Sequence, residues 1–245
     1  MFFKQIFSFG QIVLFIAFIY LFLVFFNQKL DWSAVWDYRE LFFKGWLITI
    51  ALSMASLFLS VFIGLIVALC SQSKQSIVKI FSKIYVEMIR GTPLLVQILF
   101  FYYVVAHHLG LENRYVAGVI ILSVFNGAYI AEMMRSGIEF VSATQIESAK
   151  SIGLSQYQAY RFVIFPQAIR QAIPALAGQF ASIIKDSSLL SIIGINELTN
   201  SAQQINSATY TTLEVYLPLG LAYLILTLPI SLWSKKLEKR FRYES

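Results

Sequence analysis

Two ionisable residues lie in the middle of an otherwise apolar stretch: Lys185 and Asp186, within residues 174–196. A charge at membrane depth costs about 2.5 to 3.5 kcal/mol on insertion scales, so such residues are functional candidates by default. A cation beside an anion matches the carboxylate and the ammonium of an amino-acid zwitterion. The same two residues can instead hold helices together, or gate a path by pairing across a subunit interface. Ser187 and Ser188 follow them and can satisfy freed backbone groups if the helix breaks there.

Three polar residues of a neighbouring apolar stretch share one face of a helix, because they are spaced three apart: Asn126, Tyr129 and Glu132. Asn126 lies deep enough to contact a cargo. Glu132 has an alternative role in an ion pair with Arg135, three residues later. The candidates for lining a path through a membrane are therefore Lys185, Asp186, Ser187, Asn126, Tyr129 and Glu132.

The elements that position these residues are apolar helices. Of the 245 residues, 58% are hydrophobic and 13% are charged, whereas a soluble domain has about 45 to 50% and about 25%. This composition excludes a soluble or disordered chain and predicts an all-α integral membrane protein. A bilayer core about 30 Å thick needs about 20 apolar residues per helix. Six spans follow, at residues 6–27, 45–73, 91–110, 115–131, 174–196 and 215–234.

The basic residues indicate the orientation. Most Lys and Arg residues fall in one set of loops, at residues 74–90, 135–170 and 235–245, whereas the opposite loops hold few. By the positive-inside rule, we expect a multi-pass protein with both termini in the cytoplasm. The net charge of +6 is then a matter of topology and predicts no nucleic-acid partner. The outer stretch 29–44 can hold a short interfacial helix.

About forty residues separate Arg135 from Pro174 on the cytoplasmic side, and a loop that long is normally functional or disordered. Its sequence favours order. Thr144 with Glu147 and Ser155 with Gln158 are spaced as capping boxes, and Gly153 suits a left-handed helix end. We expect two short helices, the second ending at Pro166. Because Lys150 is the one basic residue of the first helix, docking on protein is favoured over docking on lipid.

This segment resembles the cytoplasmic "EAA" loop of ATP-binding-cassette (ABC) importer permeases, through Glu147, Ser148, Ala149, Gly153 and residues 164–166. The motifs RGTPLLVQ, NGAYIAE, PQAIR and KDSSLLSIIG, which begin at residues 90, 126, 166 and 185, resemble permeases for histidine, glutamine, glutamate or arginine. The resemblance covers about residues 45–233. Thr144 stands where the family usually has glycine, and Ser148 replaces an alanine.

The resemblance implies a type I importer fold with a five-helix core and one extra N-terminal helix, in the bacterial plasma (inner) membrane. We divide the chain into residues 1–44, the transport domain 45–234 and a basic tail 235–245. The implied partners are two ABC ATPase subunits, a second permease that is identical or related, and an extracytoplasmic binding protein, with membrane lipid around them. The implied cargo is a polar amino acid. The ATPase-coupling loop would comprise Thr144, Gln145, Glu147, Ser148, Ala149, Gly153 and Pro166.

Other classes of protein fit less well. The sequence has no GxxxxGK[ST] loop, so we expect ATP and Mg²⁺ to bind the partner ATPase, with no cofactor and no catalytic residue on this chain. The single Cys70 excludes an intrachain disulfide, and His107 with His108 lacks the spacing of a metal site. A stand-alone secondary transporter or channel remains an alternative. An intramembrane enzyme would need carboxylate pairs or HExxH motifs that the spans lack.

Overall fold

The computed structural model describes residues 13, 16–17, 19–21 and 30–241, and in these residues it is all-helical, as the composition predicts. The elements in chain order are α2 (Ser33–Asp37), α3 (Arg39–Ser71), α4 (Ser76–Arg90), α5 (Leu94–Phe100), η1 (Phe101–Ala106), α6 (Arg114–Glu139), α7 (Ala143–Ser151), α8 (Gln156–Ala159), η2 (Tyr160–Ile164), α9 (Phe165–Asp186), η3 (Ser187–Ile193), α10 (Leu198–Thr209) and α11 (Thr212–Phe241). η1 and η2 are π-helical turns, and η3 is a 3₁₀ helix.

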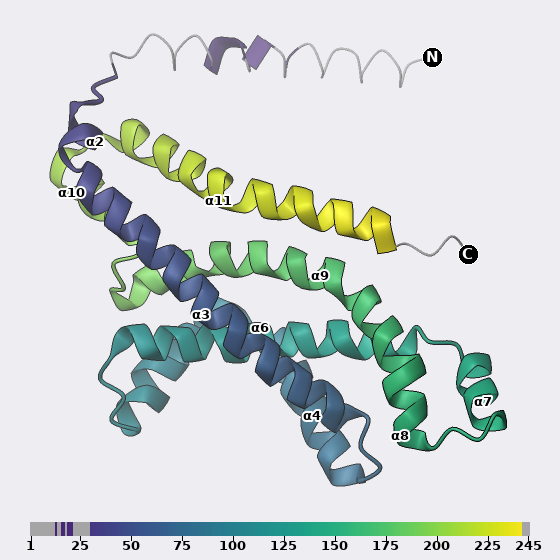
Figure 1. Cartoon of the computed structure of the whole chain (residues 1–245). Helices are drawn as coiled ribbons and strands as arrows, with labels where there is room; N and C mark the ends of the chain where they lie inside the picture. Colours follow the sequence, from purple (N-terminus) through teal and green to yellow (C-terminus); the bar gives the residue numbers. More distant parts are fainter. Residues whose placement is uncertain (1–12, 14–15, 18, 22–29, 242–245) are drawn as a thin grey trace.

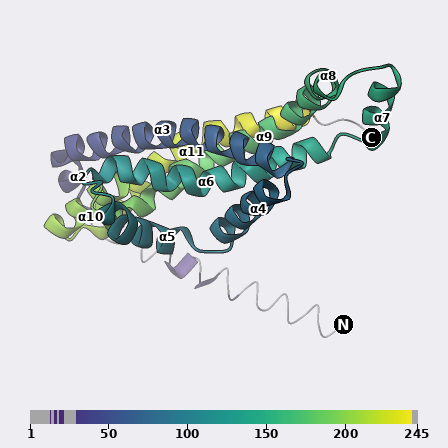
Figure 2. The same cartoon turned by 90° about the horizontal axis from the view of Figure 1, so that it is seen from below.

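Four long helices form an elongated bundle in which α6 packs between α3 and α9, and α9 packs against α11 (Figure 1). α2, α5 and α10 lie at one end of the bundle. α7 and α8 project at the opposite end, toward which α11 also runs (Figure 2). The buried core joins α3, α5, α6 and η3, with Ile98, Leu122 and Leu190 fully buried.

Three described helices are long and apolar enough to cross a membrane: α3, α6 and α11. They correspond to the expected spans 45–73, 115–131 and 215–234. The bent pair of α4 with α5 and η1 counts as a fourth if it forms one broken span. Span 174–196 corresponds to α9 and η3, which are not among the helices that pass the same criteria of length and composition. Most of span 6–27 lies outside the described residues, so the count of six stays a prediction.

The expected span 91–110 is wrong in its bounds. α4 ends at Arg90, and the chain turns by 106° before α5 begins at Leu94. The helical residues 94–106 extend over about 20 Å, too short to cross the hydrocarbon core alone. Pro93 precedes the first helical residue of α5, and no side chain caps this helix.

A glutamine side chain stabilises the bend between α4 and α5. Nε2 of Gln97 donates to the carbonyl oxygen of Ile89 at 2.7 Å and to Oγ1 of Thr92 at 2.7 Å. Gln97 is buried, so these bonds form away from solvent. One of the last carbonyl groups of α4, that of Ile89, is thereby satisfied by a residue of α5, and the bond spans the bend between the two helices.

The cytoplasmic segment confirms one capping box and contradicts the other. Oγ of Ser155 accepts from the backbone of Gln158, and the Gln158 side chain bonds back to the Ser155 backbone, as expected. α7, however, begins after Ser142 without a side-chain cap, so the predicted box of Thr144 with Glu147 is absent. Thr144 is already inside the helix and cannot serve as its cap. Gly153 has φ of +82°, the left-handed conformation expected at the end of α7.

The prediction that Pro166 ends a helix is wrong. The chain is helical without interruption from Gln156 to Asp186, and Pro166 is the second residue of α9. Proline is tolerated in a first turn because it needs no N–H donor there. The π-helical turn η2 directly before it has wider i→i+5 hydrogen bonding, which accommodates the ring.

Glycines allow α6 to approach its neighbours closely. A Cβ atom added to Gly64 of α3 would lie 2.5 Å from Ile130, and one added to Gly127 of α6 would lie 2.7 Å from Ile63. At Gly137, an added Cβ would lie 2.7 Å from the backbone oxygen of Ala168 in α9. Small residues at helix crossings are how membrane helices gain packing contacts when lipid competes for their surfaces.

We therefore predict that Gly137→Ala destabilises the protein by about 1 to 3 kcal/mol, because backbone atoms of α9 cannot move aside as a side chain can. Gly220→Ala is the matched control, since no atom lies within 4 Å of its added Cβ. It should be neutral or slightly stabilising, because alanine favours a helix. The measurement is the thermal unfolding midpoint of the detergent-purified protein. Equal midpoints for the two variants would contradict the close crossing.

Candidate functional site

The structure separates the predicted path residues into two groups. In the first group, Asn126 is fully buried between α6 and α9. Its Oδ1 accepts a hydrogen bond from Nε2 of Gln179 at 2.6 Å, and its Nδ2 donates to the carbonyl oxygen of Leu122 at 2.9 Å. The carboxyl group of Asp186 also lies next to the Asn126 side chain. A buried polar cluster therefore joins the middle of α6 to the end of α9.

The backbone changes form directly after Lys185 and Asp186, where α9 gives way to the 3₁₀ helix η3. Hydroxyl groups of Ser187 and Ser188 donate to the carbonyl oxygens of Ile184 and Lys185 at 2.8 and 2.6 Å. Both serines thus satisfy backbone groups at the break. Lys185 is exposed and Asp186 is half-buried, and neither forms an ion pair with another residue in the range 30–241.

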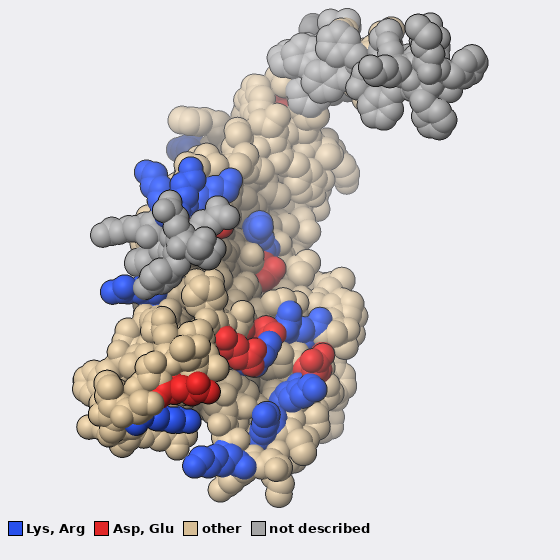
Figure 3. All heavy atoms as spheres, turned by 90° about the vertical axis from the view of Figure 1, so that its right-hand side faces the viewer, with Lys and Arg blue, Asp and Glu red and all other residues tan. Residues whose placement is uncertain are grey.

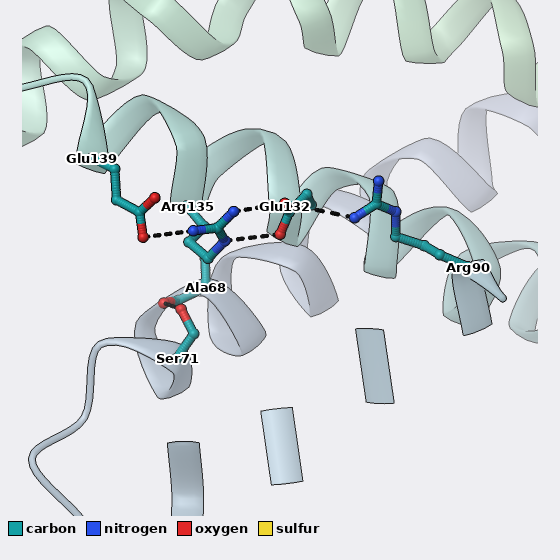
Figure 4. Close-up of polar contacts among 6 residues, drawn as sticks. All are labelled: Ala68, Ser71, Arg90, Glu132, Arg135 and Glu139. Atoms are coloured by element: carbon teal, nitrogen blue, oxygen red, sulfur yellow. Dashed lines mark hydrogen bonds and ion pairs between the residues drawn. The ribbon is translucent and has the colours of Figure 1, made fainter. Parts of the chain in front are cut away.

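The second group lies nearer α7 and includes a chain of ion pairs (Figure 4). Glu132 binds Arg135 at 2.7 Å and Arg90 at 3.6 Å, and Arg135 also binds Glu139. This confirms the intrahelical pair that the spacing of Glu132 and Arg135 indicates. Tyr129 belongs to the same group, because the guanidinium of Arg90 lies 5.5 Å from the centre of its ring.

Glu132, Arg135 and Glu139 line a hollow of about 380 Å³ between α4 and the ends of α3 and α6. It contains Lys79 and Lys83 of α4 together with the carboxylates of Glu87, Glu132 and Glu139. The lining therefore carries both signs of charge, and Glu132 is already occupied by two arginines. Tyr129 and Glu132 do not come together with Asn126 and Asp186 as one site within this chain.

Gln179 and Glu197 are among the buried polar residues that sequence analysis does not select. Glu197 is fully buried and begins α10 by accepting hydrogen bonds from the backbone N–H groups of Thr199 and Asn200 at 2.8 and 2.7 Å. It also accepts a bond from the hydroxyl of Tyr223 in α11 at 3.0 Å. Burial raises the pKa of Glu197 to about 7. Glutamate is an uncommon N-cap residue, so its position in the sequence does not indicate this role.

The residues of the predicted coupling loop form a protrusion with an apolar tip. Thr144, Gln145, Glu147 and Ser148 are exposed along α7, whereas Ala149 is buried against the segment that follows. Ile152 and Tyr157 at the tip are 77% and 74% exposed. Figure 3 looks onto this end of the molecule, where charged side chains gather.

One side-chain bond ties α7 to α9. Oε1 of Gln145 accepts from Nε2 of Gln167 at 2.7 Å, one residue after Pro166. Ala149, which is 3% exposed, is buried where α7 packs against α8 and η2. The protrusion is therefore an ordered part of the α9 end rather than a free loop.

Comparison with known proteins identifies the family. The family model described as "binding-protein-dependent transport system inner membrane component" matches residues 60–243. The chain belongs to this family. Members of this family are the inner membrane components of transport systems that depend on a binding protein. This permease chain is a multi-pass membrane protein.

The chain is similar to permeases of glutamine and nopaline transport systems. It is 32% identical over 217 residues to the glutamine transport system permease GlnP of Escherichia coli (strain K12), covering 88% of this chain and 99% of the relative. It is 38% identical over 193 residues to the nopaline transport system permease NocM of Agrobacterium fabrum, covering 75% and 80% of the two chains.

Solved structures agree with the fold of this permease. The crystal structure of an amino acid ABC transporter with histidines matches with a TM-score of 0.81 and 36% identity, covering 87% of this chain and 100% of that chain. The inward-facing MetNI methionine ABC transporter matches with a TM-score of 0.68 at 19% identity, which supports the fold alone. The expected importer permease fold is thus confirmed.

For the buried cluster we predict a strong coupling between Asn126 and Gln179. Asn126→Leu leaves the Gln179 amide without its partner and should cost about 1 to 3 kcal/mol, as should Gln179→Leu. The double variant should recover much of the loss, because it removes donor and acceptor together. Thermal unfolding midpoints of the four detergent-purified proteins measure this. Additive losses in the double variant would show that the hydrogen bond contributes little.

Proposed function

We propose that this permease is the transmembrane subunit of an ABC importer that carries a polar amino acid into the cytoplasm. Family membership gives the transport role, and amino-acid cargo is what the names of the glutamine and nopaline relatives support. The observation that carries the proposal is the ordered protrusion of α7 and α8. An ordered cytoplasmic protrusion with an apolar tip, which we call the handle (α7 and α8), is explained if a separate ATPase subunit binds it.

We propose two ABC ATPase subunits, a second permease that is identical or related, and an extracytoplasmic binding protein as partners. The absence of a GxxxxGK[ST] motif supports ATP and Mg²⁺ binding on the ATPase rather than on this chain. The distribution of basic residues supports both termini, α7 and α8 on the cytoplasmic side of the bacterial inner membrane. Residues 45–234 would form the transport domain, between the segment 1–44 and the basic tail 235–245.

The path for the amino acid would run past Asp186, Ser187 and Asn126, with Lys185 on the neighbouring exposed face of α9. Asp186 can bind the substrate ammonium, since no cation in the range 30–241 pairs with it. Lys185 supplies the opposite charge for a carboxylate, or for a gate formed with the second permease. Tyr129 and Glu132 would line the inner exit, where the Arg90 and Arg135 pairs already engage Glu132.

The structure connects the proposed ATPase-binding segment directly to the proposed substrate-binding residues. α7 is attached to the start of α9 through Gln145 and Gln167. From Gln156 the backbone is helical up to Asp186, so no flexible loop separates the handle from the proposed binding residues. A displacement of the handle by the ATPase would therefore move the end of α9 as a rigid-body event. Alternating access would follow from the approach and separation of the two ATPases.

We predict that Ile152→Asp abolishes ATP-driven uptake and co-purification of the ATPase, because a charge would replace an apolar contact at the tip. Ile152 is 77% exposed, so its replacement leaves the packing of this chain intact. Ile152→Leu is the matched control and should retain both properties. The measurements are amino-acid uptake in membrane vesicles and affinity purification from native membranes.

If Ile152→Asp retained both uptake and co-purification of the ATPase, the proposal that α7 and α8 bind the ATPase would be wrong. Uptake by this chain alone in liposomes, driven by an ion gradient, would instead favour a secondary transporter.

A further inference from the structure

An apolar cavity lies between α3, α6 and α9, at the end of the bundle nearest α8. It has a volume of about 170 Å³, and its walls are apolar and aromatic side chains. Buried alanines contribute to these walls, and their short side chains leave the space open: Ala68, Ala168 and Ala172. Leu69 and Ile169 also line the cavity and are 51% and 38% exposed, so they form its rim. An engineered apolar cavity of about 150 Å³ stays dry and binds benzene, so this one suits an apolar group.

A second hollow adjoins this cavity on the side of the handle. It has a volume of about 580 Å³, and Tyr160 and Phe165 line both spaces. The rest of its lining carries polar groups, from Gln156, Tyr157 and Arg161. Gln156 with Tyr160, and Tyr157 with Arg161, are four residues apart, so they share one face of the helical segment. Hydrogen-bond donors are therefore placed at the mouth of the apolar cavity.

Arg161 supplies a positive charge at this mouth. Its guanidinium lies 5.9 Å from the centre of the Phe162 ring, and it forms no ion pair with a residue in the range 30–241. Among the residues that the structure describes, no acidic side chain lines either hollow. A guanidinium presents its N–H donors in a fork that matches the oxygens of a phosphate. The mouth is thus suited to an anion with oxygen acceptors.

The length of the cavity matches one leaflet of a membrane. Phe165 and Leu176 both line it, and they are eleven residues apart in α9, or about 16 Å. Half of a hydrocarbon core about 30 Å thick is about 15 Å. In the positive-inside orientation, the mouth with Arg161 lies on the cytoplasmic side and the cavity extends from it toward the middle of the bilayer. The polar mouth and the apolar cavity are therefore in the order in which a phospholipid presents its headgroup and its chains.

We propose that these two adjoining hollows bind an anionic phospholipid of the cytoplasmic leaflet, with one acyl chain in the cavity and the phosphate at Arg161. Gln156 and Tyr157 donate further hydrogen bonds to the headgroup. Anionic lipids of this leaflet attract Lys and Arg, and basic pockets between membrane helices bind such headgroups. A helix of a second copy of the chain, about 10 Å across with its side chains, is too wide to enter a cavity of about 170 Å³.

The lipid would occupy a position beside the crossing of α6 and α9. Ala168 lines the cavity and also meets Gly137 at that crossing. α3 packs against both α6 and α9, so the chain of the lipid contacts three helices that hold the bundle together. A ligand that binds the folded state alone stabilises it. Anionic lipid should therefore raise the thermal unfolding midpoint of the permease more than zwitterionic lipid does.

The test is native mass spectrometry of the detergent-purified full chain with added dioleoyl phosphatidylglycerol, which is anionic, or dioleoyl phosphatidylcholine, which is zwitterionic and has the same acyl chains. The unchanged chain should retain phosphatidylglycerol several-fold better. Arg161→Gln should lower this preference about five-fold, the factor that one basic residue contributes near an anionic lipid. Arg170→Gln is the matched control, because Arg170 is an exposed cation of the same continuous helix and lines neither hollow.

A second measurement follows the acyl chain in native membranes, with the partner subunits present. Phosphatidylglycerol that carries a photoreactive diazirine on its acyl chain should label the peptides that contain Leu65 and Leu176, which line the cavity. Ile169→Trp fills the cavity from its rim and should remove most of this label. Ile66→Trp is the matched control, since Ile66 is 45% exposed on α3 and lines neither hollow. Both changes are at open positions, so the packing of the chain is retained.

Three results would overturn the proposal. The first is equal retention of the two lipids by the unchanged chain. The second is a loss of preference in Arg161→Gln no larger than in Arg170→Gln; if Arg161→Gln instead lost only the co-purifying ATPase, the mouth would be a protein contact. The third is labelling that Ile169→Trp leaves unchanged, or that appears only when the permease is separated from its partner permease, which would show that a second copy covers the cavity.

Discussion

The close approach of α6 to α3 and α9 is the constraint on which the rest of the structure depends. Lipid removes most of the hydrophobic force between membrane helices, so contact at small residues and a few buried polar bonds must hold them together. Gly64, Gly127 and Gly137 provide that contact. The bond from Gln179 to Asn126 crosses the same interface, and a wider spacing of α6 and α9 would break it. The packing of the bundle and the polar cluster therefore require each other.

Local chemistry explains which parts of the structure the sequence predicts. The capping box of Ser155 with Gln158 and the left-handed Gly153 involve atoms within three residues, and both are confirmed. The rule that proline ends a helix assumes regular i→i+4 bonding, and the π-helical turn before Pro166 removes that assumption. Thr144 has the spacing of a cap, but α7 already begins at Ala143.

The remaining polar residues have partners that sequence spacing cannot indicate. Gln179 bonds to a residue 53 positions away, Glu197 to Tyr223 26 positions away, and Gln97 to a carbonyl eight positions back across a bend. Their roles depend on how helices cross, and a single sequence does not contain the crossing geometry. Composition therefore gives the class of protein, and motifs give the coupling segment, but the buried polar cluster needs coordinates.

The uninterrupted helix from Gln156 to Asp186 has one further consequence. It bends between the α8 and α9 labels of Figure 1, with Pro174 inside α9, and it crosses α6 where Ala168 meets Gly137. Relative to that crossing, the arm toward the cytoplasm is about 18 Å long and the arm toward Asp186 is about 27 Å long. The bent helix would therefore pivot at its contact with Gly137. A small tilt of the short arm becomes a displacement about one and a half times larger at the far end.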